Sequence, residues 1–183
     1  MSEIVIAPNE VLGKIAAPFD FEKNGKSLPT LLKQMEKALL AASDPKGVGL
    51  AAPQIGKSLR IFIAKPTEKS KTAVFINPEI IESVGLDMPK TKKKRIKKLE
   101  GCLSLPDIWG EVLRAPGVAL SFSDEKGKRI TRRFKGFMAT IVQHEMDHLD
   151  GILFPKRVLE QKGVLYKSHK NEKGQDEFEE LTI

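Results

Sequence analysis

The residues of this chain that are best suited to chemistry lie in one stretch, Gln143–Gly151, which reads Gln-His-Glu-Met-Asp-His-Leu-Asp-Gly. It contains the pattern H-E-x-x-H, in which His144 and His148 stand four positions apart. On a helix, residues four apart lie on the same face, so both imidazoles can bind one metal ion. Glu145 would then stand beside the ion as a general base for a metal-bound water.

The residues before this stretch predict the helix that must carry it. Phe137 and Ile141 precede the two histidines on one apolar stripe, with spacings of four, three and four positions. We therefore expect a helix that begins after Gly136, keeps the histidines on its buried side and has Gly151 as its C-terminal cap. Two of the chain's 3 histidines fall in the pattern, whereas His169 lies in a polar tail and is expected to be solvated.

Two imidazoles need a further protein ligand, because a catalytic site of the zinc type normally has three ligands and one open position. A metzincin would place a third histidine where this chain has Phe154. A downstream carboxylate would have to be Glu160 or Glu172, both in polar segments. Upstream, the only cysteine, Cys102, offers a thiolate, although a lone cysteine is more often an inert core residue. A thiolate with two imidazoles would form a tetrahedral site suited to Zn(II) or Fe(II).

Length and composition indicate a single globular domain. The chain has 183 residues, of which 40% are hydrophobic and 30% charged, ordinary values for a soluble protein. No apolar run is long enough to span a bilayer, and the first residues lack the basic and apolar regions of a secretory signal. The single cysteine excludes an internal disulfide and fits a reducing compartment. We expect a cytoplasmic protein with no membrane segment.

The net charge of +7 is concentrated in one segment, Lys90–Lys98. Two interpretations remain open, a solvated surface loop or an electrostatic contact with a polyanion such as RNA. No aromatic residue is interleaved, so the segment gives no sign of base stacking. Its basic residues are Lys90, Lys92, Lys93, Lys94, Arg95, Lys97 and Lys98.

The rest of the chain predicts one further long helix and several strands. Ser27 can cap a helix that runs to about Ser43, with Pro29 in its first turn, after an irregular lead-in over residues 1–26. The segment 47–56 consists of small residues and, taken alone, is typical of a structural turn. Residue patterns predict strands at 59–65, 72–77, 79–84 and 118–123, a hairpin partner at 129–134, and a tail hairpin that pairs 164–169 with 177–182.

Three motifs, in this order along the chain, resemble the signatures of bacterial-type peptide deformylase. They are Gly-Val-Gly-Leu-Ala-Ala-Pro-Gln (47–54), Glu-Gly-Cys-Leu-Ser (100–104) and the stretch Gln143–Gly151. The resemblance covers about residues 5–158 and implies a single α+β domain over 1–183. In such a domain, antiparallel β-strands surround a central helix that carries the H-E-x-x-H motif, and a second helix lies near the N-terminus. For the tail, 159–183, the resemblance implies no structure.

The resemblance implies a metal-dependent hydrolase that removes the N-formyl group from the N-terminal formylmethionine of nascent proteins and releases formate. Its partners would be formyl-Met nascent peptides. One divalent ion per chain would be bound by Cys102, His144 and His148. Fe(II) is the usual ion of the family, and Zn(II), Ni(II) or Co(II) would replace it in some purified samples. Glu145 would take the proton of the metal-bound water and deliver it to the departing amine.

The resemblance also assigns residues around the reacting bond. The side-chain amide of Gln54 and the backbone N–H of Leu103 would stabilise the oxyanion, as preorganised donors do. Gly49 would contact the backbone of the substrate. The pocket for the methionine side chain would be lined by Val48, Phe137 and Ile141.

The chain departs from the family pattern in several respects. Thr140 stands where a branched apolar pocket residue is common, and Trp109 stands where relatives often have Arg. The long basic C-terminal helix by which some relatives contact the ribosome has no counterpart in this sequence. We hypothesise that Lys90–Lys98 supplies a ribosomal or RNA contact instead.

Two other functions compete with deformylation. A metallopeptidase would use the same H-E-x-x-H chemistry, but the missing downstream His or Glu ligand argues against it. An RNA- or ribosome-binding module with a degenerate metal site would rest on the lysine-rich segment alone. The complete ligand set and Glu145 argue against that module.

Overall fold

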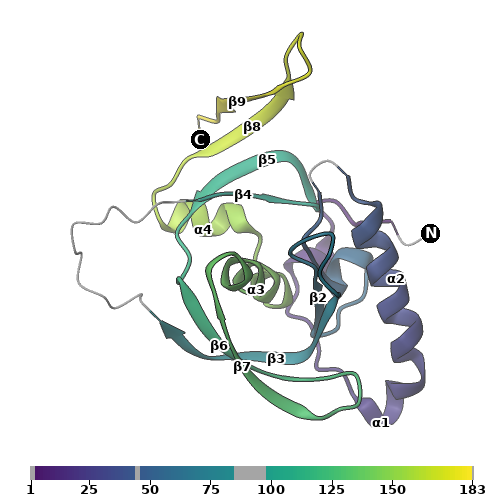
Figure 1. Cartoon of the computed structure of the whole chain (residues 1–183). Coiled ribbons are helices and arrows are strands. Elements are labelled where there is room, and N and C mark those ends of the chain that lie inside the picture. Colours follow the sequence, from purple (N-terminus) through teal and green to yellow (C-terminus); the bar gives the residue numbers. More distant parts are fainter. Residues whose placement is uncertain (1–2, 44–45, 85–97, 183) are drawn as a thin grey trace.

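The computed structural model describes residues 3–43, 46–84 and 98–182. Their strands form two antiparallel sheets, against which the helices pack (Figure 1). The predicted combination of helices with antiparallel sheets is therefore confirmed. The lysine-rich segment Lys90–Lys98 lies outside the described residues, apart from its last position, where β4 begins.

The larger sheet has β1 (Gly49–Ala51), β2 (Ile61–Ala64), β3 (Ala73–Val84), β6 (Gly117–Ser123) and β7 (Arg129–Lys135) side by side in this order. The smaller sheet has β4 (Lys98–Cys102), β5 (Leu105–Val112), β8 (Leu165–Lys170) and β9 (Asp176–Glu180). The helices are α1 (Phe21–Asn24), α2 (Leu28–Ala41), α3 (Gly136–Leu149) and α4 (Phe154–Glu160). Short 3-10 turns lie at Glu10–Gly13, Gly25–Ser27 and Ala52–Ile55.

Strand β2 shows that the larger sheet is covered on both faces. All of its residues are buried, as is typical of a strand between two layers. Phe62 shares a hydrophobic cluster with Ile141 of α3 and stacks on Phe75, with 4.4 Å between the ring centroids. Ile61 belongs to a second cluster with Met35 of α2. Successive strand residues point to opposite faces, so α3 lies on one side of the sheet and α2 on the other.

Helix α3, which contains the H-E-x-x-H residues, has a sharp boundary at each end. It begins at Gly136, whose φ of 59° turns the chain out of β7. It ends at Leu149, and Gly151 follows the cap with a φ of 69°. A Cβ atom at Gly151 would lie 2.7 Å from the carbonyl oxygen of Gly13, so this turn requires glycine.

The helix predicted near the N-terminus is α2, which begins directly after Ser27 as expected and ends at Ala41, two residues before Ser43. Ser27 occupies the N-cap position, but its side chain makes no capping hydrogen bond, because its hydroxyl donates to the backbone oxygen of Asn24 at 2.8 Å instead. The lead-in is not irregular throughout either. Asp20 caps the short helix α1 by accepting hydrogen bonds from two backbone N–H groups in its first turn.

The two strands predicted at 72–77 and 79–84 are one continuous strand, β3. Its register against β6 shifts close to Asn77, which has a φ of 47°. The side chain of Asn77 accepts a hydrogen bond from the backbone N–H of Phe19 at 2.7 Å and donates to its carbonyl oxygen at 2.9 Å. The predicted break is therefore a bulge that ties the lead-in to the sheet.

Of the remaining sequence predictions, the two hairpins were correct and the turn at 47–56 was not. The hairpin β6–β7 and the tail hairpin β8–β9 are confirmed. The segment 47–56, interpreted as a turn, contains an edge strand and a 3-10 turn, and β4, β5 and α4 were not predicted.

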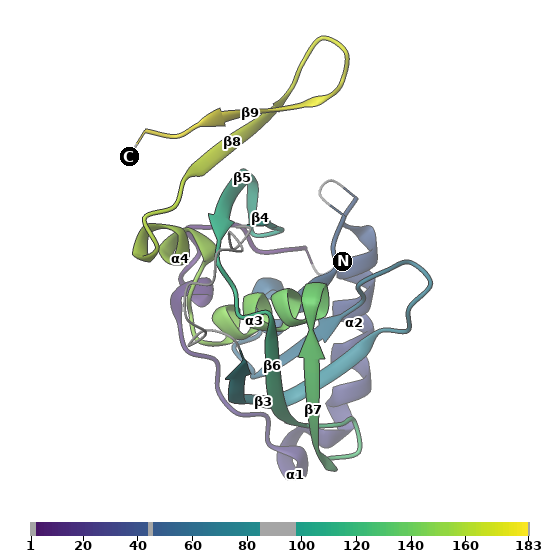
Figure 2. The ribbon, with the colours of Figure 1, turned by 60° about the vertical axis from the view of Figure 1, so that its left-hand side comes forward.

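The tail hairpin continues the smaller sheet beside β5 and projects from the body of the molecule (Figure 2). No helix in the described part of the chain is long and apolar enough to cross a membrane.

Candidate metal centre

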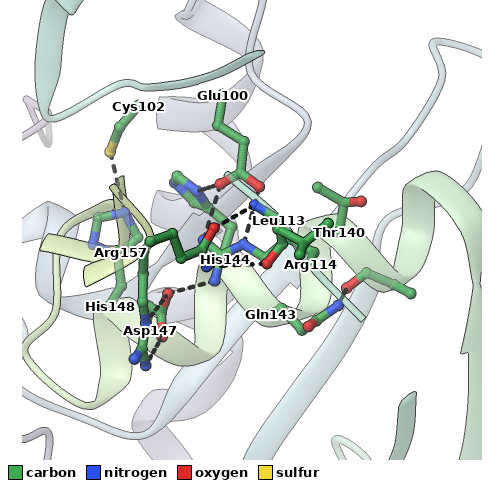
Figure 3. Close-up of polar contacts among 12 residues, drawn as sticks. Glu100, Cys102, Leu113, Arg114, Thr140, Gln143, His144, Asp147, His148 and Arg157 are labelled. Atoms are coloured by element: carbon green, nitrogen blue, oxygen red, sulfur yellow. Dashed lines mark hydrogen bonds and ion pairs between the residues drawn. The ribbon is translucent and has the colours of Figure 1, made fainter. Parts of the chain in front are cut away.

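Cys102, at the end of β4, lies next to the two histidines of α3 (Figure 3). Its Sγ atom is 3.1 Å from Nε2 of His148. One ligand atom from each of Cys102, His144 and His148 lies within 4.8 Å of the others. Ligand atoms of a tetrahedral ion stand about 3.5 Å apart, so small adjustments bring these three around one ion. A thiolate with two imidazoles is a donor set that Zn(II) and Fe(II) both accept.

The downstream alternatives for the third ligand lie elsewhere. Glu160 forms an ion pair with Arg157 on α4 at 3.1 Å, and Glu172 is exposed in the turn of the tail hairpin. The side chain of His169 is 53% exposed. Among the residues that the structure describes, the group of side chains able to hold a metal ion is Cys102, His144 and His148. The upstream thiolate therefore takes the third position.

The electrostatics of the cluster favour a bound cation. Burial raises the pKa of the Cys102 thiol, but His148 and His144 outweigh burial and lower that pKa to about 5. Burial lowers the pKa of His144, yet Cys102 and Glu100 raise it well above its usual value. The Cys102 thiolate and the Glu100 carboxylate thus place negative charge next to His144. A divalent ion bound there would meet a ready thiolate, which is the form that ligates metals.

A chain of charged side chains orients His144 (Figure 3). Nδ1 of His144 lies 3.1 Å from Oε2 of Glu100, which leaves Nε2 for a metal. Glu100 accepts two hydrogen bonds from Arg114, each of 2.9 Å. Arg114 also donates to Asp147 at 2.6 Å, and Asp147 accepts from Arg157 of α4 at 2.7 Å. A carboxylate behind a histidine ligand fixes its tautomer and ring orientation.

Glu100 and Asp147, the two acids in this series of contacts, are both buried and both paired with Arg114. The side chains of Glu100 and Asp147 are 6% and 9% exposed. Burial alone would raise the pKa of Glu100, but His144 and Arg114 lower it to about 2. Arg114 is the cation shared by both acids, so the alignment of β4 with α3 depends on it. The sequence alone predicted no role for these residues, although Glu100 lies in the motif 100–104 and Asp147 in the motif 143–151.

Glu145 is buried in the wall of the site, with 4% of its surface exposed. Among the described residues, its Oε2 has no hydrogen-bond partner. Burial raises the pKa of Glu145 to about 7, in spite of the neighbouring histidines. The backbone passes close by at Gly49, where a Cβ atom would lie 2.3 Å from Oε1 of Glu145. An unsatisfied carboxylate with this pKa is suited to exchange a proton with water near neutral pH.

Gln54 points its amide nitrogen at the metal cluster. Its Oε1 accepts a hydrogen bond from the backbone N–H of Ala51 at 2.9 Å, which fixes the orientation of the amide. The amide NH₂ is therefore turned toward Ser104 Oγ, at 3.2 Å, and Cys102 Sγ, at 3.6 Å. Gln54 is 2% exposed, so this donor is held in place before any ligand arrives.

The cluster opens into a cavity of about 240 Å³. Every site residue named from the sequence lines this cavity except His148, which is 1% exposed and lies behind it. Phe137 and Ile141 come from α3, and Val48 precedes β1. The lining also includes Trp109 and Thr140, the two positions that depart from the family pattern, as well as Lys46 and Leu99, to which the sequence gave no role.

Comparison with known proteins agrees with this geometry. Residues 1–163 match the family described as polypeptide deformylase. A peptide deformylase of Borreliella burgdorferi is 35% identical over 174 residues, which are 94% of this chain and 97% of the relative. Peptide deformylase 1 of Bacillus cereus is 38% identical over 157 residues, 85% of this chain and 91% of the relative.

Solved structures give the same result. The class I type b peptide deformylase of Acinetobacter baumannii with bound actinonin has a TM-score of 0.71 at 37% identity, over 84% of this chain and 95% of that one. The same kind of protein with bound Met-Ala-Ser has a TM-score of 0.71 at 34% identity, over 85% of this chain and 97% of that one. Sequence, fold and metal-ligating cluster therefore lead to one conclusion: the chain belongs to the polypeptide deformylase family.

Proposed function

We propose that this enzyme hydrolyses the N-formyl group of formylmethionine at the start of nascent proteins, releasing formate and a free amine. The observation that carries the proposal is the buried Cys102, His144 and His148 cluster at a cavity whose wall also contains Glu145. A relative from Acinetobacter baumannii with bound Met-Ala-Ser, a peptide that begins with methionine, supports this class of substrate.

The cluster would hold one divalent ion through the Cys102 thiolate and the imidazoles of His144 and His148. When bound, such an ion supplies a Lewis acid and lowers the pKa of a water molecule at its open position. We propose Fe(II), with Zn(II), Ni(II) or Co(II) as substitutes in a purified sample. A soft thiolate combined with imidazoles supports these ions over Mg(II) or Ca(II), which prefer oxygen ligands.

Glu145 is the proposed proton carrier of the reaction. Its carboxylate accepts a proton from the attacking water and then delivers that proton to the amine that leaves. A pKa near the working pH serves both steps, because the group must gain and lose the proton in one cycle. The burial that raises the pKa of Glu145 to about 7 supports this role.

Gln54 and Leu103 are the proposed donors to the oxyanion that forms as water attacks the formyl carbon. The Gln54 amide is preorganised by its bond to the Ala51 backbone. Leu103 lies in the turn between β4 and β5, directly after Cys102, and lines the cavity. Donors that are held in place before charge develops stabilise the transition state without further rearrangement.

The apolar part of the cavity is the proposed site for methionine. Ile141 is buried and Val48 partly buried, whereas Phe137 is 50% exposed, so the pocket opens toward solvent at one end. Gly49 is the proposed contact with the substrate backbone, and its position at the start of the edge strand β1, in the lining of the cavity, supports this role.

The remaining expectations extend this proposal. We propose that the chain acts as one domain in which strands enclose α3 as the central helix, and the packing of α3 against β1, β2, β6 and β7 supports this arrangement.

A cytoplasmic location and a ribosomal contact through Lys90–Lys98 stay predictions. For the ribosomal contact, we expect ribosome co-sedimentation to fall when these lysines are replaced by glutamine, and unchanged co-sedimentation would refute it.

The test is formate release from a formyl-Met peptide by protein prepared anaerobically with Fe(II) or Ni(II). We expect Glu145→Gln to reduce kcat by about 10²–10⁴, the usual contribution of a positioned general base, while the bound metal stays stoichiometric. Full activity of that variant would refute the assignment of Glu145. Cleavage of an internal peptide bond without formate release would instead identify a metallopeptidase, and salt-sensitive RNA binding without either activity a binding module.

A further inference from the structure

Trp109 supplies one wall of the cavity from the smaller sheet. Its register partner on β4 is Gly101, so both residues face the same side of the sheet. A Cβ atom at Gly101 would lie 2.9 Å from the indole ring, which shows that the ring lies directly over this glycine. Leu99, two positions earlier on β4, faces the same way and also lines the cavity. This wall is therefore apolar and separate from the α3 wall of Phe137 and Ile141.

The tail hairpin holds Trp109 from outside the cavity. The indole Nε1–H donates to Ser168 Oγ on β8 at 3.1 Å, and that hydroxyl lies 3.5 Å from the carbonyl oxygen of Asp107. Phe178 of β9 meets the indole edge-on, with 5.8 Å between ring centroids and an angle of 86°. Strand β8 pairs with β5 directly at Trp109, opposite Tyr166, and both views show the hairpin beside β5 (Figures 1 and 2).

The hairpin lies beyond residues 1–163, over which the chain matches the family as a whole. That match ends at residue 163, and β8 begins at Leu165. Every residue of β9 is exposed, so β9 contributes little to the core. Phe178 is 45% exposed and yet directs its ring at Trp109. The contacts of the hairpin thus converge on a side chain that forms part of the substrate cavity.

We propose that Trp109 is a specificity-determining residue, against which the side chain following formylmethionine packs, and that the tail hairpin positions it through Ser168 and Phe178. The proposal rests on the proposed function. If α3 takes the methionine, the rest of the peptide leaves the cavity past its other walls, one of which is Trp109. A flat indole favours apolar and aromatic side chains and offers no counter-charge to an acidic one.

The first test compares formate release from formyl-Met-Leu-Ser and formyl-Met-Asp-Ser. We expect wild-type kcat/KM to be about tenfold higher for the leucine peptide, mainly through KM, which is the size of one apolar contact in a pocket. Trp109→Ala should remove most of this difference, and Trp109→Phe should keep part of it. An unchanged ratio in Trp109→Ala would overturn the proposal. Formate release from either peptide by the wild type tests the proposed function separately.

The second test examines the hairpin. Trp109 is the only tryptophan of the chain, so intrinsic fluorescence reports on its indole alone. Ser168→Ala and Phe178→Ala should shift the emission to the red, increase acrylamide quenching and reduce the leucine preference. Ser168→Thr keeps the hydroxyl and should restore both readouts. The matched control is Lys167→Ala, an exposed neighbour that faces the other side of β8. Wild-type fluorescence and ratio in both alanine variants would overturn the positioning role of the hairpin.

Discussion

His144 on α3 and Glu100 on β4 are joined by a contact of 3.1 Å between Nδ1 and Oε2. The contact connects His144, an imidazole ligand of the candidate metal site, to the strand that ends in Cys102, which supplies the thiolate ligand. Two elements that are far apart in the sequence are thereby locked into one geometry. Because Arg114 holds the far side of Glu100, the metal cluster depends on residues that touch no ion.

The contact predicts a loss of metal affinity in Glu100→Gln. The neutral amide fills the same space but is a weaker acceptor for His144, and removal of a carboxylate behind a histidine ligand costs about 10–100-fold in affinity. Competition with a chromophoric chelator measures the change. The control is Glu160→Gln, which alters an exposed acid at the far end of the same chain of charges and should bind metal normally. Wild-type affinity in Glu100→Gln would show that the contact is incidental.

Arg114→Met should destabilise the fold strongly. The variant leaves the carboxylates of Glu100 and Asp147 buried without their shared cation, which costs about 3–5 kcal/mol in free energy of unfolding. Urea denaturation monitored by circular dichroism measures it. Arg133→Met is the matched control, because the pair of Arg133 with Glu82 is 2.8 Å long but largely exposed and should contribute about 0–1 kcal/mol. Equal losses in the two variants would contradict the assignment.

Gly49→Ala should impair catalysis more than folding. The added Cβ would lie 2.3 Å from Oε1 and 2.9 Å from Cδ of Glu145, so the carboxylate must move. A displacement of this size lowers kcat by about a hundredfold in well-positioned sites. Gly13→Ala adds the same methyl group where no other described residue lies within 4 Å, and this variant should leave the rate unchanged. Steady-state kinetics on a formyl-Met peptide measure kcat for both variants. An unaltered kcat in Gly49→Ala would be evidence against Glu145 as the proton carrier.

Removal of the metal should lower thermal stability as well as activity. An ion that binds only the folded state, present at a hundredfold its Kd, adds about 2.7 kcal/mol, which corresponds to about 5–10 °C in Tm for a chain of this length. Calorimetry before and after treatment with a chelator measures the shift, and added Co(II) or Zn(II) should reverse it. Cys102→Ala lacks the thiolate and should show a much smaller shift. An equal shift in that variant would mean that the ion binds elsewhere.

The sequence by itself determined the local parts of this protein. Helix α3 follows from apolar spacing and from the glycines at its two ends, and the pairing of His144 with His148 follows from helical geometry. The hairpins β6–β7 and β8–β9 follow from residue alternation and from glycine at their turns. All of these features depend on contacts between residues close in the chain, and such contacts leave a periodic signal in the sequence.

Only the tertiary structure decided how the distant parts meet. No spacing rule could bring Glu100, Arg114 and Asp147 together in one series of buried ion pairs, because these pairs depend on how β4, the segment after β5 and α3 pack. The role of the tail hairpin beside Trp109 likewise appears only once β8 pairs with β5. Residues 47–56 seemed a simple turn because their small side chains give no periodic signal, whereas Gly49 is defined by its approach to Glu145. Long-range contacts arise from the packing of the whole chain, and a local sequence pattern does not encode them.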